Sequence, residues 1–470
     1  MAKFHCGIDF GTTNSSAALS CDGAVRVLEL DPLNDNPASL PSLLYITNEG
    51  EQIVGRAAAD AFIDRNVDRE VQLKQVDLGV AIEAYVGGEP DKSETYRPAA
   101  APTDVREGVR ARATIEVNSP GRLFQSLKTQ LRHTAFRGTE VFGTLYQIEE
   151  LVACILRRVK AAVEEAAGAP VERVVFGRPV RFSTHDAEND VAQRRLETAA
   201  RLAGFSEVTF FYEPVGACVE YALGIEQRQR LMVVDIGGGT CDVCVMEFGG
   251  ARGAAARLAE SRILGISGVP VAGDAIDREI IKSKLFPVFG SRVRYGPSRL
   301  RIPQYIFNEI LDWQNLYKLN TEEIVHWFLA MEADCTAPGS VRALRMLIQR
   351  NYGYPVAREV ESAKKRLSWE DEAEIRLHMD TVDIQERLER EEFTHIIEYN
   401  LERMMRSIEE AEAAAQVRPK DIDLVLTTGG TSLIPAIRHM LAERFGADRL
   451  LPRDTFTSVA TGLATVAQYC

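Results

Sequence analysis

The sequence predicts an α/β protein made of two related halves, and two Gly-rich turns are the observations behind this prediction. The first turn lies in "GIDFGTTNSS", residues 7–16, where an apolar strand runs to Asp9 and opens into a Gly-Thr turn. The second lies in "LMVVDIGGGTCDVCVM", residues 231–246, where a buried strand ends at Asp235 and a glycine turn leads through Thr240 into another strand. One such turn is commonly a plain hairpin. The same order of residues twice, about 226 positions apart, indicates two related domains that face each other.

The residue types of both turns suit a nucleotide phosphate and its metal ion. Glycines lack Cβ, so backbone amides in a tight turn can approach an anion closely. Asp9 and Asp235 would repel a phosphate, but each is placed to hold the hydrated Mg²⁺ that accompanies a nucleotide. The two turns together therefore predict one nucleotide between two lobes.

A third Gly-rich turn joins a strand to a helix. In "IDLVLTTGGTSLIPAIRHMLAERFG", residues 422–446, a buried strand at 424–428 runs into Gly429 and Gly430. The amino terminus of the helix that follows is a general site for a phosphate or a ribose edge. The chain has no Walker A pattern, and no G-x-G-x-x-G opens a helix after a first strand, so neither a P-loop nor a Rossmann site is expected. The spacing predicts that the helix buries Ile434, Ile437, Leu441 and Phe445.

A further helix is predicted in "REVESAKKRLSWE", residues 358–370. Glu361, Lys364, Lys365 and Ser368 share one face of it at helical spacing. Two interpretations stay open for this face. It is either a solvated face with a Glu361–Lys365 pair, or a face that grips a nucleoside.

Composition bounds the class of protein. The chain has 470 residues, which predicts two or more domains, and its formal net charge is −13. That charge argues against general binding to nucleic acid or to anionic membranes, because both require a basic face. The start "MAKFHCGIDF" lacks the apolar core of a signal peptide, and no apolar run approaches the ~18 residues of a membrane span. We therefore expect a soluble, cytoplasmic protein.

Eight cysteines are scattered through apolar segments and are expected to be reduced, buried thiols. Cys241 and Cys244 form a C-x-x-C pattern, which in other contexts binds zinc or carries redox chemistry. Here the pattern stands in an expected strand, where a period of two sends the side chains to opposite faces. No second pair completes a zinc site, so structural thiols are the favoured interpretation.

Six stretches in one order along the chain resemble the ATPase domain of the heat-shock protein 70 family, within the actin and sugar-kinase superfamily. Beside the three turns and "ESAKKRLS", the stretch "FYEPVGACVEYALG" at 211–224 resembles the family's connecting segment. "AGDAIDREI" at 272–280 resembles the motif that follows the second hairpin. The resemblance spans residues 7–462 and implies an actin-like ATPase fold, with two duplicated RNase H-like lobes and a nucleotide cleft between them.

The resemblance implies ATP or ADP, Mg²⁺ and a monovalent cation such as K⁺ as cofactors, and a role for each matching residue. Asp9 and Asp235 would organise Mg²⁺ through water, Asp242 would help to hold the monovalent cation, and Glu213 would orient water. Thr240 completes the expected catalytic set of Glu213, Asp235 and Asp9. The nucleotide-binding residues that it implies are Gly11, Thr12, Thr13, Asn14, Gly237, Gly238, Gly239, Thr240, Gly273, Asp277, Glu361, Lys364, Lys365, Ser368, Gly429, Gly430 and Thr431.

Four departures accompany the resemblance. The chain ends at Cys470, from which we expect an ATPase domain alone, without a peptide-binding domain, as in the short relatives called YegD-like. Leu433 stands where an arginine would stack on adenine, and Ala275 replaces an acid. In "GRAAA", Ala59 stands where the family carries a catalytic lysine.

The loss of that lysine predicts a slow enzyme. A methyl group cannot offset charge beside the γ-phosphate, so we expect ATP to be bound but hydrolysed more slowly than in lysine-bearing relatives, and Ala59→Lys to raise the rate. Lys128, in "RLFQSLKTQLRHTAFRG", is the nearest stand-in along the sequence. It is interpreted as a solvated or packing residue, because most lysines are surface groups.

The expected domains follow the duplication. Lobe I is predicted to hold residues 1–224 and 455–470, and lobe II residues 225–454. Residues 86–109 are rich in Gly, Pro and charge and are expected to form a long surface loop of lobe I.

A second insertion, residues 285–356, lies where the family has its small clamp subdomain, and it contains Trp313 and Trp327. It is either an enlarged helical core or a surface for a protein client or regulatory partner.

The leading functional prediction is a chaperone-like protein that binds and slowly hydrolyses ATP, so that lobe closure controls a partner. One alternative is a filament-forming actin relative, whose polymer would pellet after ATP is added. A second alternative is a small-molecule kinase, which would need an acceptor pocket and a base that the motifs do not supply.

Overall fold

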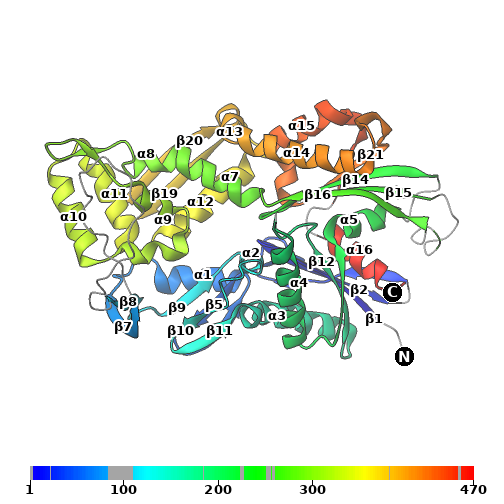
Figure 1. Cartoon of the computed structure of the whole chain (residues 1–470), viewed down its shortest axis with the longest axis horizontal. Helices are drawn as coiled ribbons and strands as arrows, with labels where there is room; N and C mark the ends of the chain where they lie inside the picture. The colour runs from blue at the N-terminus through cyan, green and yellow to red at the C-terminus, as the bar shows by residue number, and fades with distance from the viewer. Residues whose placement is uncertain are drawn as a thin grey trace, which may run out of the picture.

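Two β-sheets with the same strand order form the centre of the computed structural model (Figure 1). The structure describes residues 4–21, 23–82, 109–183, 185–222, 227–249, 256, 260–379, 382–453 and 457–469. The first sheet runs in the order β13 (Glu207–Tyr212), β12 (Arg173–Arg178), β1 (Phe4–Phe10), β2 (Asn14–Cys21) and β3 (Ala24–Val27), and β4 (Leu40–Pro41) also pairs with β2. The second runs in the order β22 (Leu450–Pro452), β21 (Leu424–Thr428), β14 (Gln229–Ile236), β15 (Cys241–Phe248) and β16 (Arg262–Val269).

Strand directions match between the sheets as well. The hairpins β1–β2 and β14–β15 are antiparallel, and each has a parallel strand, β12 or β21, beside its first strand. A second parallel strand and an antiparallel one complete each sheet. This is the duplicated architecture that the two turns predict, and it is the actin-like ATPase fold.

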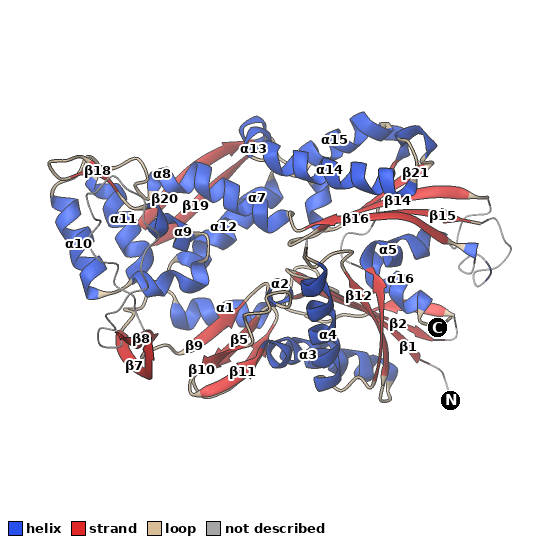
Figure 2. Ribbon diagram, in the orientation of Figure 1, coloured by secondary structure: helices blue, strands red, loops and turns tan. Residues whose placement is uncertain are grey.

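Two helices, α5 (Glu213–Ala222) and α16 (Ser458–Val466), lie between the sheets (Figure 2). α16 packs on β1, β2 and α5, while α5 packs on β14 and β15. One buried apolar cluster joins Val175 of the first sheet, Val219 of α5, Val233 of the second sheet and Leu463 of α16. The two sheets are therefore held together through these helices.

Other helices cover the outer faces of the sheets. α3 (Ile148–Ala167) and α4 (Asp186–Leu202) bury their apolar side chains in one cluster with the first sheet. α14 (Glu398–Ala415) packs on β15 and β16, and α15 (Pro435–Phe445) packs on β22. The predicted stripe on the last of these helices is confirmed, since Ile434, Ile437, Leu441 and Phe445 are all buried.

Short elements extend lobe I beyond its sheet. β6 (Gln52–Val54), β5 (Leu44–Thr47) and β9 (Gly121–Phe124) form a sheet on which α1 (Arg56–Asn66) packs. Lobe I also contains two hairpins and one short helix: β7 (Leu73–Ile82) with β8 (Val109–Glu116), β10 (Gly138–Val141) with β11 (Thr144–Gln147), and α2 (Leu127–Gln130).

Some of the predicted boundaries fall on residues outside those that the structure describes. The expected surface loop 86–109 lies outside them except for Val109, the first residue of β8. The lobe boundaries at 224/225 and 454/455 also lie outside them and stay predictions.

Residues 285–356 form short helices and strands in lobe II, and their apolar side chains are packed in a common core. Trp327 packs on Tyr295 and Phe328, with ring centroids 5.8 and 5.1 Å apart. Ile306, Leu316 and Leu347 of the same region join the main core cluster of lobe II. The elements from η1 to α13 are η1 (Ile281–Leu285), α8 (Phe286–Val288), β17 (Arg294–Tyr295), β18 (Leu300–Arg301), α9 (Gln304–Ile310), η2 (Trp313–Leu319), α10 (Glu322–Ala333), α11 (Pro338–Gln349), α12 (Gly353–Arg366), β19 (Glu372–Met379), β20 (Val382–Glu389) and α13 (Arg390–Ile396).

Trp313 connects this region to lobe I. Its ring lies 5.6 Å from that of Phe62 on α1 and 4.9 Å from that of Tyr354 on α12. Nearby, Tyr352 Oη donates to Asp68 Oδ1 at 2.6 Å. The two tryptophans are thus packed side chains, and neither supplies the exposed aromatic surface that the partner interpretation needs.

The cysteines behave as the strand periodicity predicts. Cys241 lies in the core cluster that contains Ile276, whereas Cys244 lies in the cluster that contains Val219 of α5. In the described part of the chain, Cys6, Cys154, Cys218, Cys241, Cys244 and Cys335 are free thiols. The interpretation of Cys241 and Cys244 as structural residues on opposite faces is confirmed.

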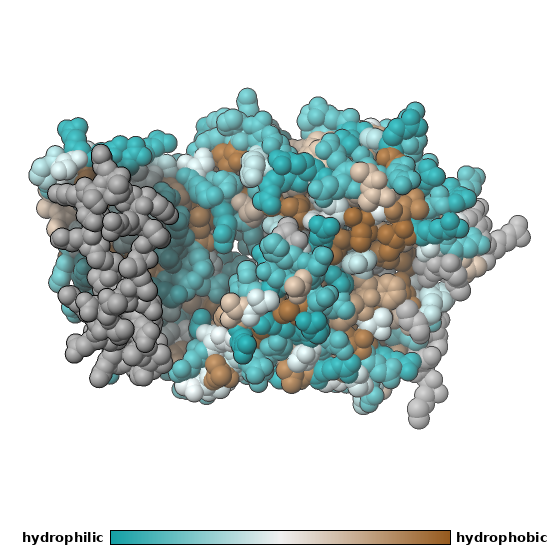
Figure 3. Space-filling view, in the orientation of Figure 1, coloured by the Kyte–Doolittle hydropathy of each residue, from teal (hydrophilic) through white to brown (hydrophobic). Residues whose placement is uncertain are grey.

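The visible surface is mainly hydrophilic, with hydrophobic residues gathered right of centre, where the two sheets and α5 lie in the same view (Figure 3). Among the described residues, no helix has the length and apolar content that crossing a membrane requires.

Candidate functional site

The first two Gly-rich turns meet where their hairpins end. The β1–β2 turn carries Thr12 and Thr13, and the β14–β15 turn carries Gly238 and Gly239. A Cβ on Gly239 would lie 2.6 Å from Thr12 Oγ1, and a Cβ on Gly238 would overlap Thr13 Oγ1. Only glycine permits this approach, so the lack of a side chain brings together turns that are far apart in the sequence.

The third turn supports the second from the other side. Thr431 Oγ1 donates to the carbonyl oxygen of Gly237 at 2.7 Å, from the short helix η4 (Gly430–Leu433). Gly429 has a φ of +78°, and a Cβ there would overlap the carbonyl oxygen of Ile236. At the start of α7 (Gly273–Ile280), the Gly273 amide donates to the same Gly237 oxygen at 3.2 Å. The three Gly-rich turns therefore form one continuous surface.

Four acidic side chains lie beside these turns. Asp9 and Asp235 occupy the last position but one of β1 and β14, and Glu213 is the first residue of α5. Asp242 pairs with Asp235 across the β14–β15 hairpin, and its Oδ1 accepts from the Val180 amide of lobe I at 2.7 Å. The four acids thus come from both lobes.

Burial and mutual repulsion act on these carboxyl groups. Burial, followed by the charge of Glu213, raises the pKa of Asp9 to about 7 and that of Asp242 to about 7. The same two causes raise the pKa of Asp235 well above its usual value. The cluster therefore carries more negative charge than its surroundings favour, and a divalent cation would relieve that excess.

Within the ranges that the structure describes, no group of three or more His, Cys, Asp or Glu side chains is arranged to hold a metal ion. That Asp9 and Asp235 act on Mg²⁺ through water stays a prediction.

Lys128, which the sequence analysis names as the nearest stand-in for the absent lysine, lies beside the acidic side chains. Its side chain is 6% exposed, and its Nζ lies 2.6 Å from Glu213 Oε1. Burial raises the pKa values of Asp9 and Asp242, and the positive charge of Lys128 opposes this by lowering them. The solvated interpretation of Lys128 is therefore wrong, because its side chain is buried and its charge lies beside the acids, whereas a structural role stays open.

Ala59 lies in a different environment. It is 2% exposed on α1 and belongs to an apolar cluster with Tyr45, Phe62 and Tyr354. A lysine at this position would have to leave the cluster to bring its ammonium group to the acids, because burial there is costly for a charge. The expected gain in rate from Ala59→Lys therefore loses its physical basis.

The predicted nucleoside face on α12 divides into two parts. Lys364 is buried, and its Nζ donates to Asp277 Oδ2 at 2.7 Å and to the Gly273 carbonyl at 3.2 Å. Lys365 is exposed and pairs with Glu361 at 2.7 Å, as the solvated interpretation expects. Ser368 follows the end of the helix at Arg366. The buried part therefore faces α7 and the second turn, and the outer part faces solvent.

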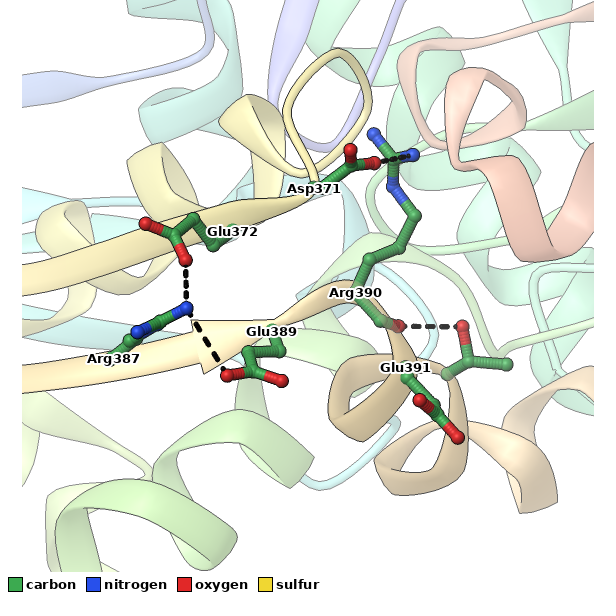
Figure 4. Close-up of a pocket in the computed structure, with 7 residues that line it drawn as sticks. Asp371, Glu372, Arg387, Glu389, Arg390 and Glu391 are labelled. Carbon is green, nitrogen blue, oxygen red and sulfur yellow. Dashed lines mark hydrogen bonds and ion pairs between the residues drawn. The ribbon is translucent and has the colours of Figure 1, made fainter.

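A separate charged hollow lies on the β19–β20 hairpin and α13 (Figure 4). Arg387 pairs there with Glu372 and Glu389, and Arg390 pairs with Asp371. None of the predicted site residues lines this hollow, and both arginines are engaged by acids, so we assign no ligand to it.

A family model described as "Hsp70 protein" matches residues 125–255 and 348–469, which together make up more than half of the chain. The chain belongs to the Hsp70 family. The sequence resemblance to the nucleotide-binding domain of that family is thereby confirmed. Lys128, Glu213, Asp235 and Asp242 all fall within the matched residues, whereas Asp9 precedes them.

Two similar proteins agree with the Hsp70 assignment. "Chaperone protein DnaK 1" of Synechococcus sp. and "Chaperone protein dnaK3" of Synechococcus elongatus are each 25% identical to this chain over 448 residues. Each alignment covers 94% of this chain and 47% of the relative. The chain spans about half the length of the curated relatives that it matches.

Proposed function

We propose that this Hsp70-family chain binds ATP and ADP with Mg²⁺ where the three Gly-rich turns meet, and hydrolyses ATP slowly. The contact of Thr12 and Thr13 with Gly238 and Gly239, beside buried acids, is the observation that carries the proposal. Backbone amides of both turns would bind the phosphates, since consecutive amides in tight turns attract anions.

The acids would share the work around the phosphates. Asp9 and Asp235 would hold Mg²⁺ through water, and Glu213 would orient the attacking water. Mg²⁺, when bound, neutralises charge on the phosphates. Catalysis of phosphoryl transfer is mostly positioning and charge neutralisation, and buried groups fixed by strands and a helix terminus suit that task. K⁺ at Asp242 stays a prediction.

The nucleoside would lie on the lobe II side of the site. Lys364, held by Asp277 and the Gly273 carbonyl, fixes α12 against α7 next to the second turn. The third turn, with Gly429, closes the same edge. We propose that these elements bind the ribose and base, with Leu433 contributing an apolar contact in place of a stacking arginine.

A chaperone-like role would follow from coupling between nucleotide and lobes. The bond from the Val180 amide to Asp242, and the packing of Trp313 on Phe62, join the two lobes directly. We propose that exchange of ATP for ADP changes these contacts in the cytoplasm, and that a protein partner responds to the change.

Calorimetry with Mg-ATP and Mg-ADP tests the proposed function. We expect both nucleotides to bind, and excess EDTA to weaken the binding of ATP at least tenfold, or ~1.4 kcal/mol. Phosphate release should be slow, and the protein should stay in the supernatant after ATP is added. Absence of binding for both nucleotides would overturn the proposal, and an ATP-dependent pellet would favour a filament.

A further inference from the structure

Lys128 places a buried positive charge among the acidic side chains of the site. Its Nζ lies 2.6 Å from Glu213 Oε1, and both side chains are at most 7% exposed. Burial lowers the pKa of this ammonium group, whereas the charge of Glu213, and to a smaller extent the charges of Asp9 and Asp242, raise it. The lysine therefore faces acids from both lobes.

The fold fixes this position through lobe I. α2 is a single short helix. Leu127, its first residue, and Leu131, directly after it, are both buried in the core cluster of the first sheet. Ser126, immediately before the helix, has a left-handed φ of +56°, which turns the chain sharply after β9. β9 in turn is paired with β5. With apolar anchors on either side, the lysine has little freedom to leave the acids.

The Lys160–Glu164 ion pair, within one helix, differs in its environment from the Lys128–Glu213 pair. Lys160 Nζ lies 2.7 Å from Glu164 Oε1 on α3, four residues along one helix, and its Nζ also donates to the Val171 carbonyl. Lys128 instead reaches an acid 85 residues away, on the helix that joins the two sheets. That acid is the residue to which the proposed function gives the attacking water.

We propose that Lys128 is the positioning residue of the hydrolytic site: its ammonium group holds the Glu213 carboxylate in the orientation that aligns water on the γ-phosphate. In this step the water oxygen bonds to the γ-phosphorus while the bond from that phosphorus to the β–γ bridging oxygen breaks. ADP leaves with the electron pair, and the proton of the water passes to the released phosphate. The inference rests on the proposed function, and it supplies from α2 the charge that Ala59 cannot provide.

The test compares Lys128→Met, Lys128→Arg and the control Lys160→Met by three measurements. Calorimetry reports affinity for Mg-ADP, single-turnover hydrolysis reports the chemical step, and trapping with ADP and aluminium fluoride reports affinity for a transition-state mimic. For Lys128→Met we expect hydrolysis to fall about a hundredfold, with a matching loss of the trapped complex and a less than threefold change in Mg-ADP affinity. Lys128→Arg should recover part of the loss, and Lys160→Met should hydrolyse ATP at the unmodified rate.

A double-mutant cycle with Glu213→Gln separates positioning from general stabilisation. If Lys128 acts through Glu213, Lys128→Met adds little to the loss of hydrolysis that Glu213→Gln already causes. The double variant removes both charges of the Lys128–Glu213 pair, so it keeps the test open if Lys128→Met alone, which leaves Glu213 unpaired, does not fold. Hydrolysis within threefold of the unmodified protein in a folded, ADP-binding Lys128→Met variant would overturn the inference. Loss of Mg-ADP binding in the unmodified protein would instead refute the proposed function.

Discussion

The two lobes share one strand order but differ at the positions that would touch a nucleotide. Asp9 on β1 and Asp235 on β14 are equivalent, yet the residue that faces Asp9 across its hairpin is Ser16, whereas Asp242 faces Asp235. Ser16 Oγ is buried and has no hydrogen-bond partner among the residues that the structure describes, whereas Asp242 accepts from the amide of Val180. Duplication has kept the scaffold and has changed the chemistry on it.

Each lobe also brings one buried lysine–acid pair to the site. The pair in lobe I is Lys128 with Glu213, and the pair in lobe II is Lys364 with Asp277. The first pair stands among the acids at the hairpin ends, while the second joins α12 to the start of α7. We infer that lobe I supplies the charged side chains that act in hydrolysis, and that lobe II supplies the contacts that bind the nucleoside.

The largest expected effect comes from blocking the contact between the two turns. Gly239→Ala places a methyl group 2.6 Å from Thr12 Oγ1, so one turn must move. We expect Mg-ATP affinity to fall by ~2–3 kcal/mol, thirtyfold or more, in calorimetry. Gly339→Ala, at the start of α11 and outside the site, is the control, because its Cβ would meet nothing within 4 Å. Equal losses for the two variants would contradict the contact as the cause.

Exchange of the equivalent acids tests whether the duplication is functional. Asp9→Asn and Asp235→Asn each keep the shape of the side chain but remove the charge that faces Mg²⁺. We expect each to weaken Mg-ATP binding by ~1.4 kcal/mol or more, tenfold in affinity. Unchanged affinity in both variants would refute the metal assignment, and a loss in one alone would assign the metal to one lobe.

Removal of the lobe II lysine should give a different signature from removal of the lobe I lysine. Lys364→Met leaves Asp277 unpaired beside the second turn, so Mg-ATP and Mg-ADP should both bind about fivefold more weakly, or ~1 kcal/mol. Single-turnover hydrolysis at saturating ATP should change little. Lys282→Met, which removes an exposed lysine paired with Glu279, is the control. A loss of hydrolysis larger than the loss of affinity would contradict the division of roles.

The smallest effect concerns pH. Burial raises the pKa of Asp9 and Asp242 from 3.8 to about 7, so the folded protein holds protons there that the unfolded chain has lost. Stability of the nucleotide-free protein should therefore decline as pH rises from about 4 through about 7. Thermal unfolding at pH 6 and pH 8 checks the sign, and Mg²⁺ with ADP should offset the decline at pH 8. A nucleotide-free protein that is more stable at pH 8 would show that these acids are not the buried, crowded groups described above.

The elements that sequence reasoning found are those with a local signature. The strand–Asp–Gly turns, the Gly429–Gly430 turn and the stripe on α15 each follow from residues a few positions apart. Lys128 could not be assigned in this way, because its partner is 85 residues away and the pairing of β5 with β9 brings α2 to the site. The sequence held one signal that Lys128 is placed close to the core. Leu127 and Leu131 are four residues apart, as on one face of a helix, and the structure shows that both are buried.

The contact of Trp313 with Phe62 escaped sequence reasoning for the same reason. The two rings stand on segments of different lobes, and no periodicity in either segment reports on the other. Aromatic content alone favoured a helical core and left a partner surface open as the alternative. Packing of Trp327 on Tyr295 and Phe328 supports the helical core for residues 285–356.

A crystal structure with Mg²⁺ and ADP would show whether the two hairpins bind one nucleotide. We expect phosphates in contact with amides of both turns, a hydrated metal ion between Asp9 and Asp235, and the base beside α12 and Gly429. Nucleotide bound to a single turn, or at a place remote from both, would contradict it.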